Sequence, residues 1–268
     1  MGYQPERQEL LLLVAEAARE AAAVIRDAAP RRRTIDWQSK GVTDFVSEVD
    51  LAAEARILKV LTRALPQATV LAEESAADTP PEKVASGLAL VIDPLDGTTN
   101  FLHGYPEYAV SIAVLSDGEP VAAVVYDVPG DEVFTATAGG GAHLNGSPIR
   151  VSTITEPTRA LIGTGFPFKD PAEIPAYQER MSRVMAQVSG VRRPGAASID
   201  LASVAAGRFD AFWEHMLSPW DFAAGMLLVR EAGGEVTDLR GGHLRAVGPS
   251  GVLAGNPVMR GWLGKVVG

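Results

Sequence analysis

The 268-residue sequence contains no cysteine. This absence excludes disulfide bonds, thiolate zinc sites and every hydrolytic mechanism that uses a cysteine nucleophile. The sequence also lacks a long apolar run free of charge, because acidic and basic residues interrupt the alanine-rich stretch at 15–30. That stretch therefore predicts neither a signal peptide nor a membrane span. We expect a cytoplasmic protein that does not contact a membrane.

Basic residues are in the minority, with 24 Lys and Arg against 33 Asp and Glu and a net charge of −9. A general nucleic-acid binder normally presents a basic patch, and the triplet at 31–33 is too short to form one. We therefore expect no direct binding of nucleic acid. The four histidines show no H-x-x-x-H spacing, so each is interpreted as structural or exposed.

The spacing of apolar residues predicts an α+β fold with two differently built halves. Helical periodicity covers residues 10–25 and 51–65, and the segment at 39–50 before the second helix reads as a turn or hairpin. Four strands then follow with short turns, which favours a mostly antiparallel sheet. They lie at 88–92, 109–115, 120–128 and 132–138.

After residue 150 the pattern alternates between helix and strand. Strands are expected near 161, 209–214, 234–238 and 251–255, and helices at 176–188, 199–206 and 221–232, with the last two short strands finishing the chain. The change suggests a boundary near 150–157. We expect an N-terminal domain at 1–152 with an antiparallel sheet and most of the metal ligands, and a C-terminal domain at 153–268 with a mixed sheet that completes the active site.

The stretch 91–101 reads VIDPLDGTTNF. Asp, Pro and Gly all favour turns, so a turn is its plainest interpretation. Asp93 directly follows an apolar strand pattern, and Asp96 comes three residues later. Their carboxylates and the carbonyl of Leu95 can converge on one cation, in the all-oxygen environment that Mg²⁺ prefers.

The residues that follow suit an anion. Gly97 permits a sharp turn, and Thr98 or Thr99 can open a short helix whose exposed N–H groups face a phosphate. A phosphate ester would be repelled by so acidic a chain, and bound Mg²⁺ supplies the missing positive charge. The stretch therefore predicts a cation site beside an anion site.

Other acidic residues can complete this site. Each alone is better explained as a solvated carboxylate or a helix cap, and Asp221 in particular precedes a predicted helix. Their combination is what indicates a metal centre. The residues concerned are Asp44, Asp50, Glu73, Glu74 and Asp221.

Four separated blocks together resemble the inositol monophosphatase family, the lithium-sensitive, magnesium-dependent phosphomonoesterases. They are KGVTDFVSEVD (40–50), LAEES (71–75), VIDPLDGTTNF (91–101) and WDFAAGMLLVREAGG (220–234). One departure is Ala72, where the family usually has glycine. The resemblance implies the layered αβαβα sandwich of the sugar phosphatases and a homodimer.

The resemblance also implies a metal-ligand set for two or three Mg²⁺ ions. Glu73, Asp93 and the carbonyl of Leu95 would hold the first ion, and Asp93, Asp96 and Asp221 the second. A third, weaker ion would touch Glu73. The chemistry implied is hydrolysis by two-metal activation of water, with no covalent phosphoenzyme.

Catalytic roles carry over in the same way. Thr98, paired with Asp50 and helped by Glu73, would orient and deprotonate the attacking water. Lys40 and Asp44 would belong to a mobile loop that closes on the metals.

Substrate-binding roles complete the resemblance. The backbone at Gly97 and Thr98, with Thr99 beside them, would grip the phosphate. Glu214 and Asp221 would contact the leaving group, next to a loop formed by Gly195 and Ala196.

We expect hydrolysis of a small polyol phosphate monoester, with inositol-1-phosphate first. The alternatives are fructose-1,6-bisphosphate, histidinol phosphate and adenosine 3′,5′-bisphosphate. A hypothesis of another class is a regulatory binding protein, since some bacterial relatives associate with the transcription machinery.

Overall fold

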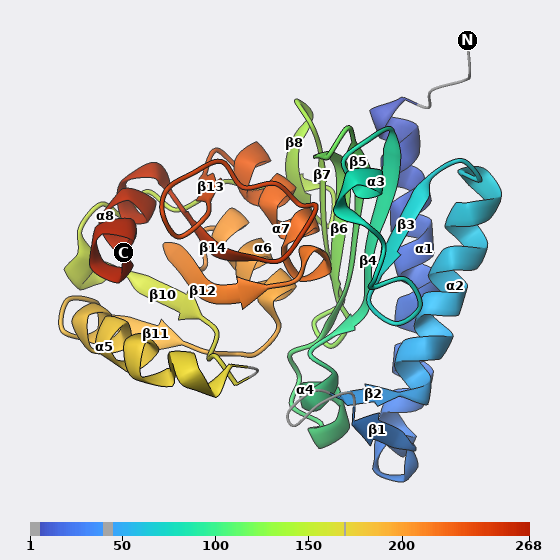
Figure 1. The fold of residues 1–268 in the computed structure, drawn as a ribbon, viewed down its shortest axis with the longest axis horizontal. Coiled ribbons are helices and arrows are strands. Elements are labelled where there is room, and N and C mark those ends of the chain that lie inside the picture. Colours follow the sequence, from blue (N-terminus) through green and yellow to red (C-terminus); the bar gives the residue numbers. More distant parts are fainter. Residues whose placement is uncertain (1–5, 40–44, 169) are drawn as a thin grey trace.

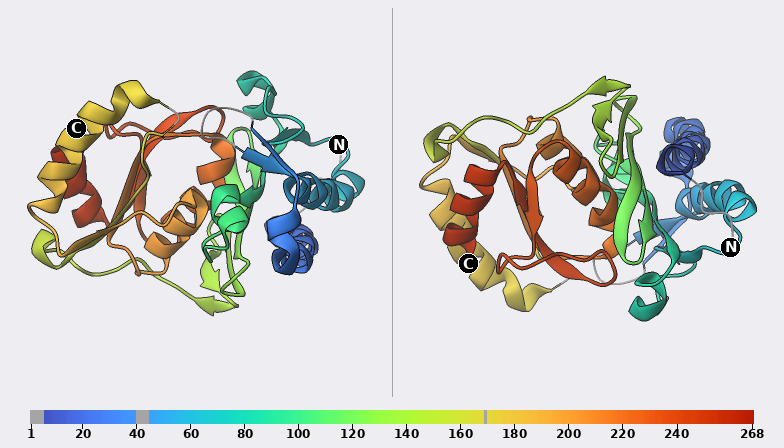
Figure 2. Two further views of the ribbon diagram at one scale, coloured as in Figure 1. Left: turned by 90° about the horizontal axis from the view of Figure 1, so that it is seen from below. Right: turned by 90° about the horizontal axis from the view of Figure 1, so that it is seen from above.

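The computed structural model describes residues 6–39, 45–168 and 170–268, and its chain forms five layers (Figure 1). Two pairs of helices form the outer layers, two sheets lie inside them, and a third helix pair separates the sheets; views from below and above show the same order (Figure 2). The expected αβαβα sandwich is confirmed. In layer order the helices are α1 (Arg7–Ala28) and α2 (Glu48–Ala64), then α6 (Ala197–Ala205) and α7 (Pro219–Glu231), then α5 (Ile174–Met185) and α8 (Pro257–Val267).

The first sheet has seven strands in the order β3-β4-β5-β6-β7-β8-β9. All neighbouring pairs are antiparallel except β3 and β4, as expected for segments joined mostly by short turns. Asn145 and Gly146 form the turn between β8 and β9, both with positive φ. The strands are β3 (Thr69–Ala72), β4 (Leu88–Asp96), β5 (Ala109–Ser116), β6 (Glu119–Asp127), β7 (Glu132–Thr137), β8 (Gly141–Leu144) and β9 (Ser147–Pro148).

The second sheet is mixed, in the order β11-β10-β12-β14-β13. Strand β10 runs parallel to both of its neighbours, and the remaining pairs are antiparallel. A separate antiparallel hairpin precedes α2 and consists of β1 (Trp37–Ser39) and β2 (Phe45–Ser47). The strands of the second sheet are β10 (Leu161–Thr164), β11 (Gly190–Arg192), β12 (Ala211–Leu217), β13 (Glu235–Thr237) and β14 (Ser250–Gly255).

The chain ends in a helix, so the expectation that β14 would finish it was wrong. Asn256 caps α8 by accepting hydrogen bonds from the Val258 and Met259 N–H groups at 3.1 and 2.9 Å. Pro257 follows the cap at the first helical position, as is common. The shorter helical turns are η1 (Ala29–Thr34), α3 (Pro81–Val84), α4 (Thr98–His103), η2 (Pro157–Arg159) and η3 (Pro171–Glu173).

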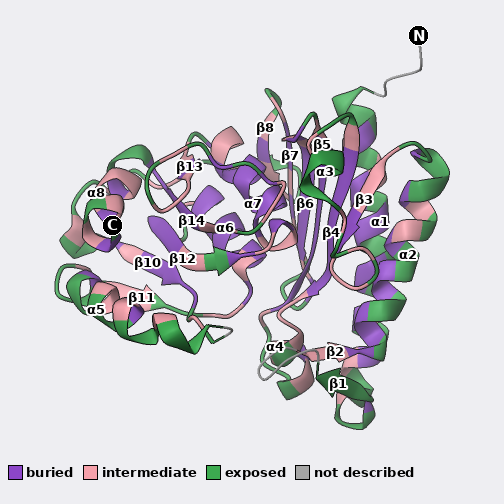
Figure 3. Ribbon diagram, in the orientation of Figure 1, coloured by how far each residue is buried: buried purple, intermediate pink, exposed green. Residues whose placement is uncertain are grey.

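Strand alternation divides the core between the layers. Leu90 and Ile92 pack with α1 and α2, while Val91 belongs to the central cluster with α6 and α7. The buried residues of Figure 3 follow this layering. The central cluster joins residues from both sides of the expected 152/153 boundary, including Val91 and Phe222; the two-domain division remains a prediction.

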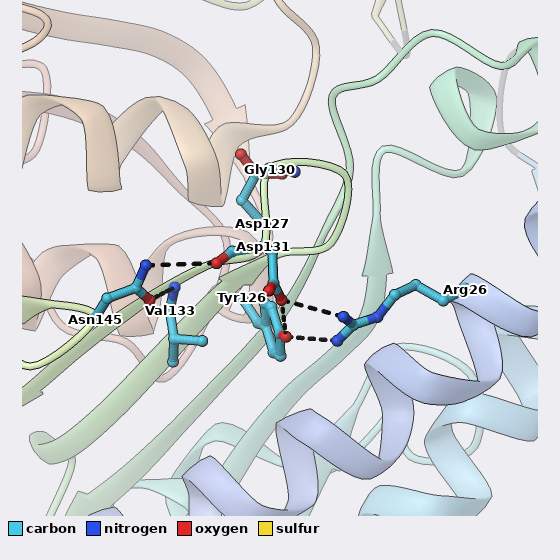
Figure 4. Close-up of polar contacts among 7 residues, drawn as sticks. All are labelled: Arg26, Tyr126, Asp127, Gly130, Asp131, Val133 and Asn145. Carbon is cyan, nitrogen blue, oxygen red and sulfur yellow. Dashed lines mark hydrogen bonds and ion pairs between the residues drawn. The ribbon is translucent and has the colours of Figure 1, made fainter.

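A polar network fixes α1 to the outer face of the first sheet (Figure 4). Arg26 donates to the Tyr126 hydroxyl at 2.5 Å and to Asp131 at 3.1 Å, and the same hydroxyl donates to Asp131 at 2.5 Å. Asn145 accepts from the Val133 N–H of β7 at 2.9 Å, and its amide donates to the Asp131 carbonyl at 3.5 Å. Through Asp131, the β6–β7 turn is therefore bound to α1 on one side and to the β8–β9 turn on the other.

Helices α6 and α7 pack closely against each other between the sheets. A Cβ atom added at Gly225 of α7 would lie 2.4 Å from Leu201 Cβ on α6, whereas one added at Gly261 of α8 would meet nothing within 4 Å.

We expect Gly225→Ala to lower the free energy of unfolding by about 1–3 kcal/mol through overpacking. Gly261→Ala should raise it by up to about 1 kcal/mol, because alanine favours helix. Urea titration of both variants tests this, and equal effects would contradict the close packing.

Candidate active site

The central carboxylates lie on an irregularity of β4. Its pairing with β5 runs regularly to Asp93 opposite Ser111, then shifts so that Asp96 pairs with Ala109. Pro94 lacks an N–H for the ladder, and the Leu95 N–H donates instead to Asp93 Oδ1 at 3.0 Å. The extra residue makes a β-bulge, a feature that redirects side chains.

Gly97 turns the chain from β4 into α4. Its φ of 89° is left-handed, and an added Cβ would lie 2.8 Å from the Glu107 carbonyl oxygen, so only glycine fits without a shift. The first helical hydrogen bond of α4 runs from the Phe101 N–H to the Gly97 carbonyl at 3.0 Å. The N–H groups of Thr98 and Thr99 precede that bond and therefore have no acceptor within the helix.

Asp221 reaches the same place from α7. Ser218 caps this helix, and its N–H donates to Asp221 Oδ2 at 2.7 Å, which completes a capping box. The capping role considered from the sequence is thus present, yet oxygens of Asp93, Asp96 and Asp221 also lie within 4.8 Å of one another. The Ser111 hydroxyl secures the start of α7 to β5 by donating to the Trp220 carbonyl at 3.1 Å.

Ser198, at the second position of α6, is a functional candidate that the sequence did not indicate. It is fully buried, and its N–H and hydroxyl donate to the same Asp96 oxygen at 2.8 and 2.6 Å. These two bonds fix the orientation of the Asp96 carboxylate. No local pattern could have revealed this contact, because the partners are 102 positions apart.

Asp50 and Thr98, expected to act together, are hydrogen bonded. Asp50 Oδ2 accepts from the Ser47 N–H at 2.9 Å and hydroxyl at 2.5 Å, and its Oδ1 lies 2.7 Å from the Thr98 hydroxyl. Burial raises the pKa of Asp50 above its usual value, although the hydrogen bonds from Ser47 and Thr98 lower it in part. If Thr98 donates to Asp50, its lone pairs can accept from a water.

Glu73 follows β3, and its N–H donates to the Ile92 carbonyl at 3.1 Å. The backbone of the next residue, Glu74, is bound to α2. Its N–H donates to Glu54, which is only 3% exposed, at 2.9 Å. Sequence reasoning missed Glu54, which sits among the apolar positions of an amphipathic helix. The backbone of the LAEES segment is thus fixed against both β4 and α2.

The carboxylates repel one another strongly. Burial raises the pKa of Asp93 well above its usual range, and the charges of Glu73, Asp96 and Asp221 raise it further. Clustered carboxylates of this kind are stabilised by a cation, and oxygen ligands suit a hard ion such as Mg²⁺. The residues present therefore fit a metal centre.

These groups line a cavity of about 590 Å³ between the two sheets. The lining includes Glu73 and Asp221 from the metal candidates and Thr98 and Thr99 from the glycine-threonine turn. It also includes the substrate candidates Gly195, Ala196 and Glu214, together with Arg193 and Asp200. The structure thus gathers these predicted residues around one space, whereas Lys40 and Asp44 lie outside the described residues.

Gly165 makes room for the Glu214 carboxylate. An added Cβ at Gly165 would lie 2.0 Å from Glu214 Cδ, so a side chain there would displace the carboxylate. His215, the next residue on β12, lies 3.6 Å from Glu173 through Nε2. Asp170, Glu173 and His215 form a second group with metal-ligand spacing, which sequence spacing alone did not show.

An αβαβα sandwich with converging carboxylates beside a glycine-threonine turn has the architecture of a metal-dependent phosphatase. A model of the inositol monophosphatase family matches residues 6–267. The chain belongs to this family. Within the described residues, no helix is long and apolar enough to cross a membrane.

Relatives in sequence and in structure agree with this assignment. The Nus factor SuhB of Salmonella typhimurium strain LT2 is 45% identical over 250 residues, 92% of this chain and 91% of the relative. The crystal structure of the extragenic suppressor protein suhB from Bartonella henselae has a TM-score of 0.88 and 40% identity, covering 96% and 98% of the two chains. The structure of an inositol monophosphatase from Anabaena (Nostoc) has a TM-score of 0.83 and 37% sequence identity, covering 97% of this chain and 95% of the other.

Metal binding should depend on pH because Asp93 is difficult to ionise. A carboxyl with a raised folded pKa stabilises the fold at low pH, and that contribution is lost as pH rises above about 4, the unfolded value. Mg²⁺ favours the ionised form. We therefore expect saturating Mg²⁺ to raise the thermal midpoint by several degrees at pH 8 and distinctly less at pH 5.

Differential scanning fluorimetry with and without Mg²⁺ measures both shifts. Asp93→Asn is the matched control, because it keeps the shape of the side chain and removes its charge. It should lose most of the Mg²⁺ response without a lower midpoint in EDTA. Equal Mg²⁺ shifts at both pH values would contradict this account of the site.

Proposed function

We propose that the protein hydrolyses the phosphate monoester of a small polyol, with inositol-1-phosphate converted to inositol and phosphate. The observation that carries the proposal is the convergence of Asp93, Asp96 and Asp221 beside the Gly97–Thr98 turn, in one cavity with Glu214. Membership of the inositol monophosphatase family supports the choice of substrate. A homodimer and inhibition by lithium belong to the same proposal.

The proposed metal ligands come from the first sheet and from helix α7. Glu73, Asp93 and the Leu95 carbonyl would hold one Mg²⁺, and Asp93, Asp96 and Asp221 another, with a third ion near Glu73. Bound Mg²⁺ supplies positive charge and Lewis acidity for the attacking water and the leaving oxygen. The bound cations would thereby offset the repulsion that an acidic chain exerts on phosphate.

The chain's own groups position the reactants. The Thr98 hydroxyl donates to Asp50 Oδ1, so its lone pair would accept a hydrogen bond from the attacking water and orient the water oxygen toward phosphorus. When the water gives its proton to Thr98, the hydroxyl proton of Thr98 would pass to the Asp50 carboxylate. Glu73 would assist in removing that proton. The N–H groups at Gly97, Thr98 and Thr99 would bind the phosphate oxygens.

The leaving group would lie toward the second sheet. Glu214 would accept hydrogen bonds from its hydroxyls, with Gly195, Ala196 and Asp221 lining the same space. A bisphosphate would need a further cation there. The sequence offers Lys169, Arg192 and Arg193 as candidates, and Lys169 lies outside the described residues. Both arginines are exposed, but Arg193 lines the cavity, whereas Arg192 donates to the Val191 carbonyl. Arg193 would therefore serve fructose-1,6-bisphosphate or adenosine 3′,5′-bisphosphate.

Phosphate release in Mg²⁺ from inositol-1-phosphate, fructose-1,6-bisphosphate, histidinol phosphate and adenosine 3′,5′-bisphosphate tests the proposal. We expect the highest kcat/KM for inositol-1-phosphate. Asp93→Asn should lower it by at least ~10²-fold, as removal of a group that supports transition-state charge does. Its circular dichroism should match the wild type. Near-normal turnover in this variant would refute the metal assignment.

We propose a second role in association with the transcription machinery. Its support is the name Nus factor SuhB carried by relatives of 43 to 47% identity. A pull-down with purified RNA polymerase tests it. Equal retention of the wild type and Asp93→Asn would support a role separate from catalysis, and no retention of either would refute it.

A further inference from the structure

Asp200 occupies an unusual position in the wall of the cavity. It lies on α6, two residues after Ser198, and only 1% of its surface is exposed. Its backbone N–H donates to the Ala196 carbonyl at 3.0 Å, so the helix holds it in place. Its side-chain oxygen Oδ1 is buried and has no hydrogen-bond partner among the described residues.

A buried carboxyl oxygen without a partner destabilises the fold and therefore needs an explanation. Two other buried carboxylates among the described residues do have hydrogen-bond partners. Asp210, 6% exposed, accepts from the Leu161 N–H at 2.7 Å, and Glu54 accepts from the Glu74 N–H. Asp200 differs from both because it also lines the cavity.

The charges around Asp200 favour its neutral form. Burial raises the pKa of this carboxyl well above its usual value, and Glu214 of β12, Glu107 of the α4–β5 loop and Asp96 of β4 raise it further. Arg193, after β11, is the opposing charge. A neutral carboxyl can donate a hydrogen bond, which the ionised form cannot.

Glu214 supplies the complementary acceptor in the same cavity. The absence of a side chain at Gly165 leaves space for its carboxylate, and its charge acts on Asp200. A ligand hydroxyl both donates and accepts. One hydroxyl can thus donate to Glu214 while it accepts from Asp200.

The geometry points to Asp200 as a specificity-determining residue that donates a hydrogen bond to a leaving-group hydroxyl whose own proton is accepted by Glu214. The ligand class is a polyol phosphate, and the inference deepens the proposed function on which it rests. A ring without hydroxyls gains nothing from this pair. The pair therefore selects the alcohol and leaves the phosphate chemistry to the carboxylates of β4 and α7.

The test compares inositol-1-phosphate with cyclohexyl phosphate, which has the same ring without the hydroxyls. The readout is the ratio of their kcat/KM values in Mg²⁺. Asp200→Leu keeps the size of the side chain and removes both oxygens, so the ratio should fall about threefold to tenfold, the loss of one hydrogen bond. Asp200→Asn keeps a donor and should remain within about threefold of the wild type.

Asp200→Ala is measured in parallel, since a shorter side chain makes no new contacts, and Glu214→Gln should lower the same ratio. Thermal unfolding establishes that each variant is folded. A ratio unchanged in both Asp200→Leu and Asp200→Ala, or an asparagine variant as impaired as the leucine one, overturns the inference alone. A wild type that hydrolyses neither ester overturns the proposed function and this inference with it.

Discussion

The repulsion between carboxylates in a buried site is the constraint on which the rest of this structure depends. Asp96 and Asp221 raise the cost of ionising Asp93, so the three carboxylates would separate if their backbones were free. The fold keeps them together because each carboxylate accepts a hydrogen bond from a fixed backbone N–H group. The site is therefore preorganised for a cation before any cation binds.

Each attachment uses a group that also has a structural task. The bulge of β4 turns the Leu95 N–H toward Asp93, the cap of α7 engages one Asp221 oxygen, and Ser198 holds Asp96. Asp50 likewise caps α2 through Ser47 and reaches Thr98 with its other oxygen. A helix cap needs only one carboxylate oxygen, so the second remains for chemistry. The capping and catalytic interpretations of these acids are compatible for this reason.

The part of the site carried by one short segment could be predicted from the sequence. Asp93, Asp96 and Gly97 lie within five residues, and the turn chemistry of that segment is local. Ser198 and Glu54 could not be predicted, because their partners are set by the packing of α6 and α2 against the first sheet. The terminal helix α8 did have a signal, the Asn256–Pro257 cap before apolar residues at helical spacing, and that signal was overlooked.

Helix α6 contributes two groups to the site. Ser198 holds the Asp96 carboxylate, and Asp200, two residues later, lines the cavity together with Glu214. Because α6 packs closely on α7, a movement of one helix would disturb Asp96 and Asp221 together. In the proposed function, substitutions at Asp200 would change which alcohol fits while β4 and its carboxylates stay in place. The alcohol preference could then change without a change in the proposed metal ligands.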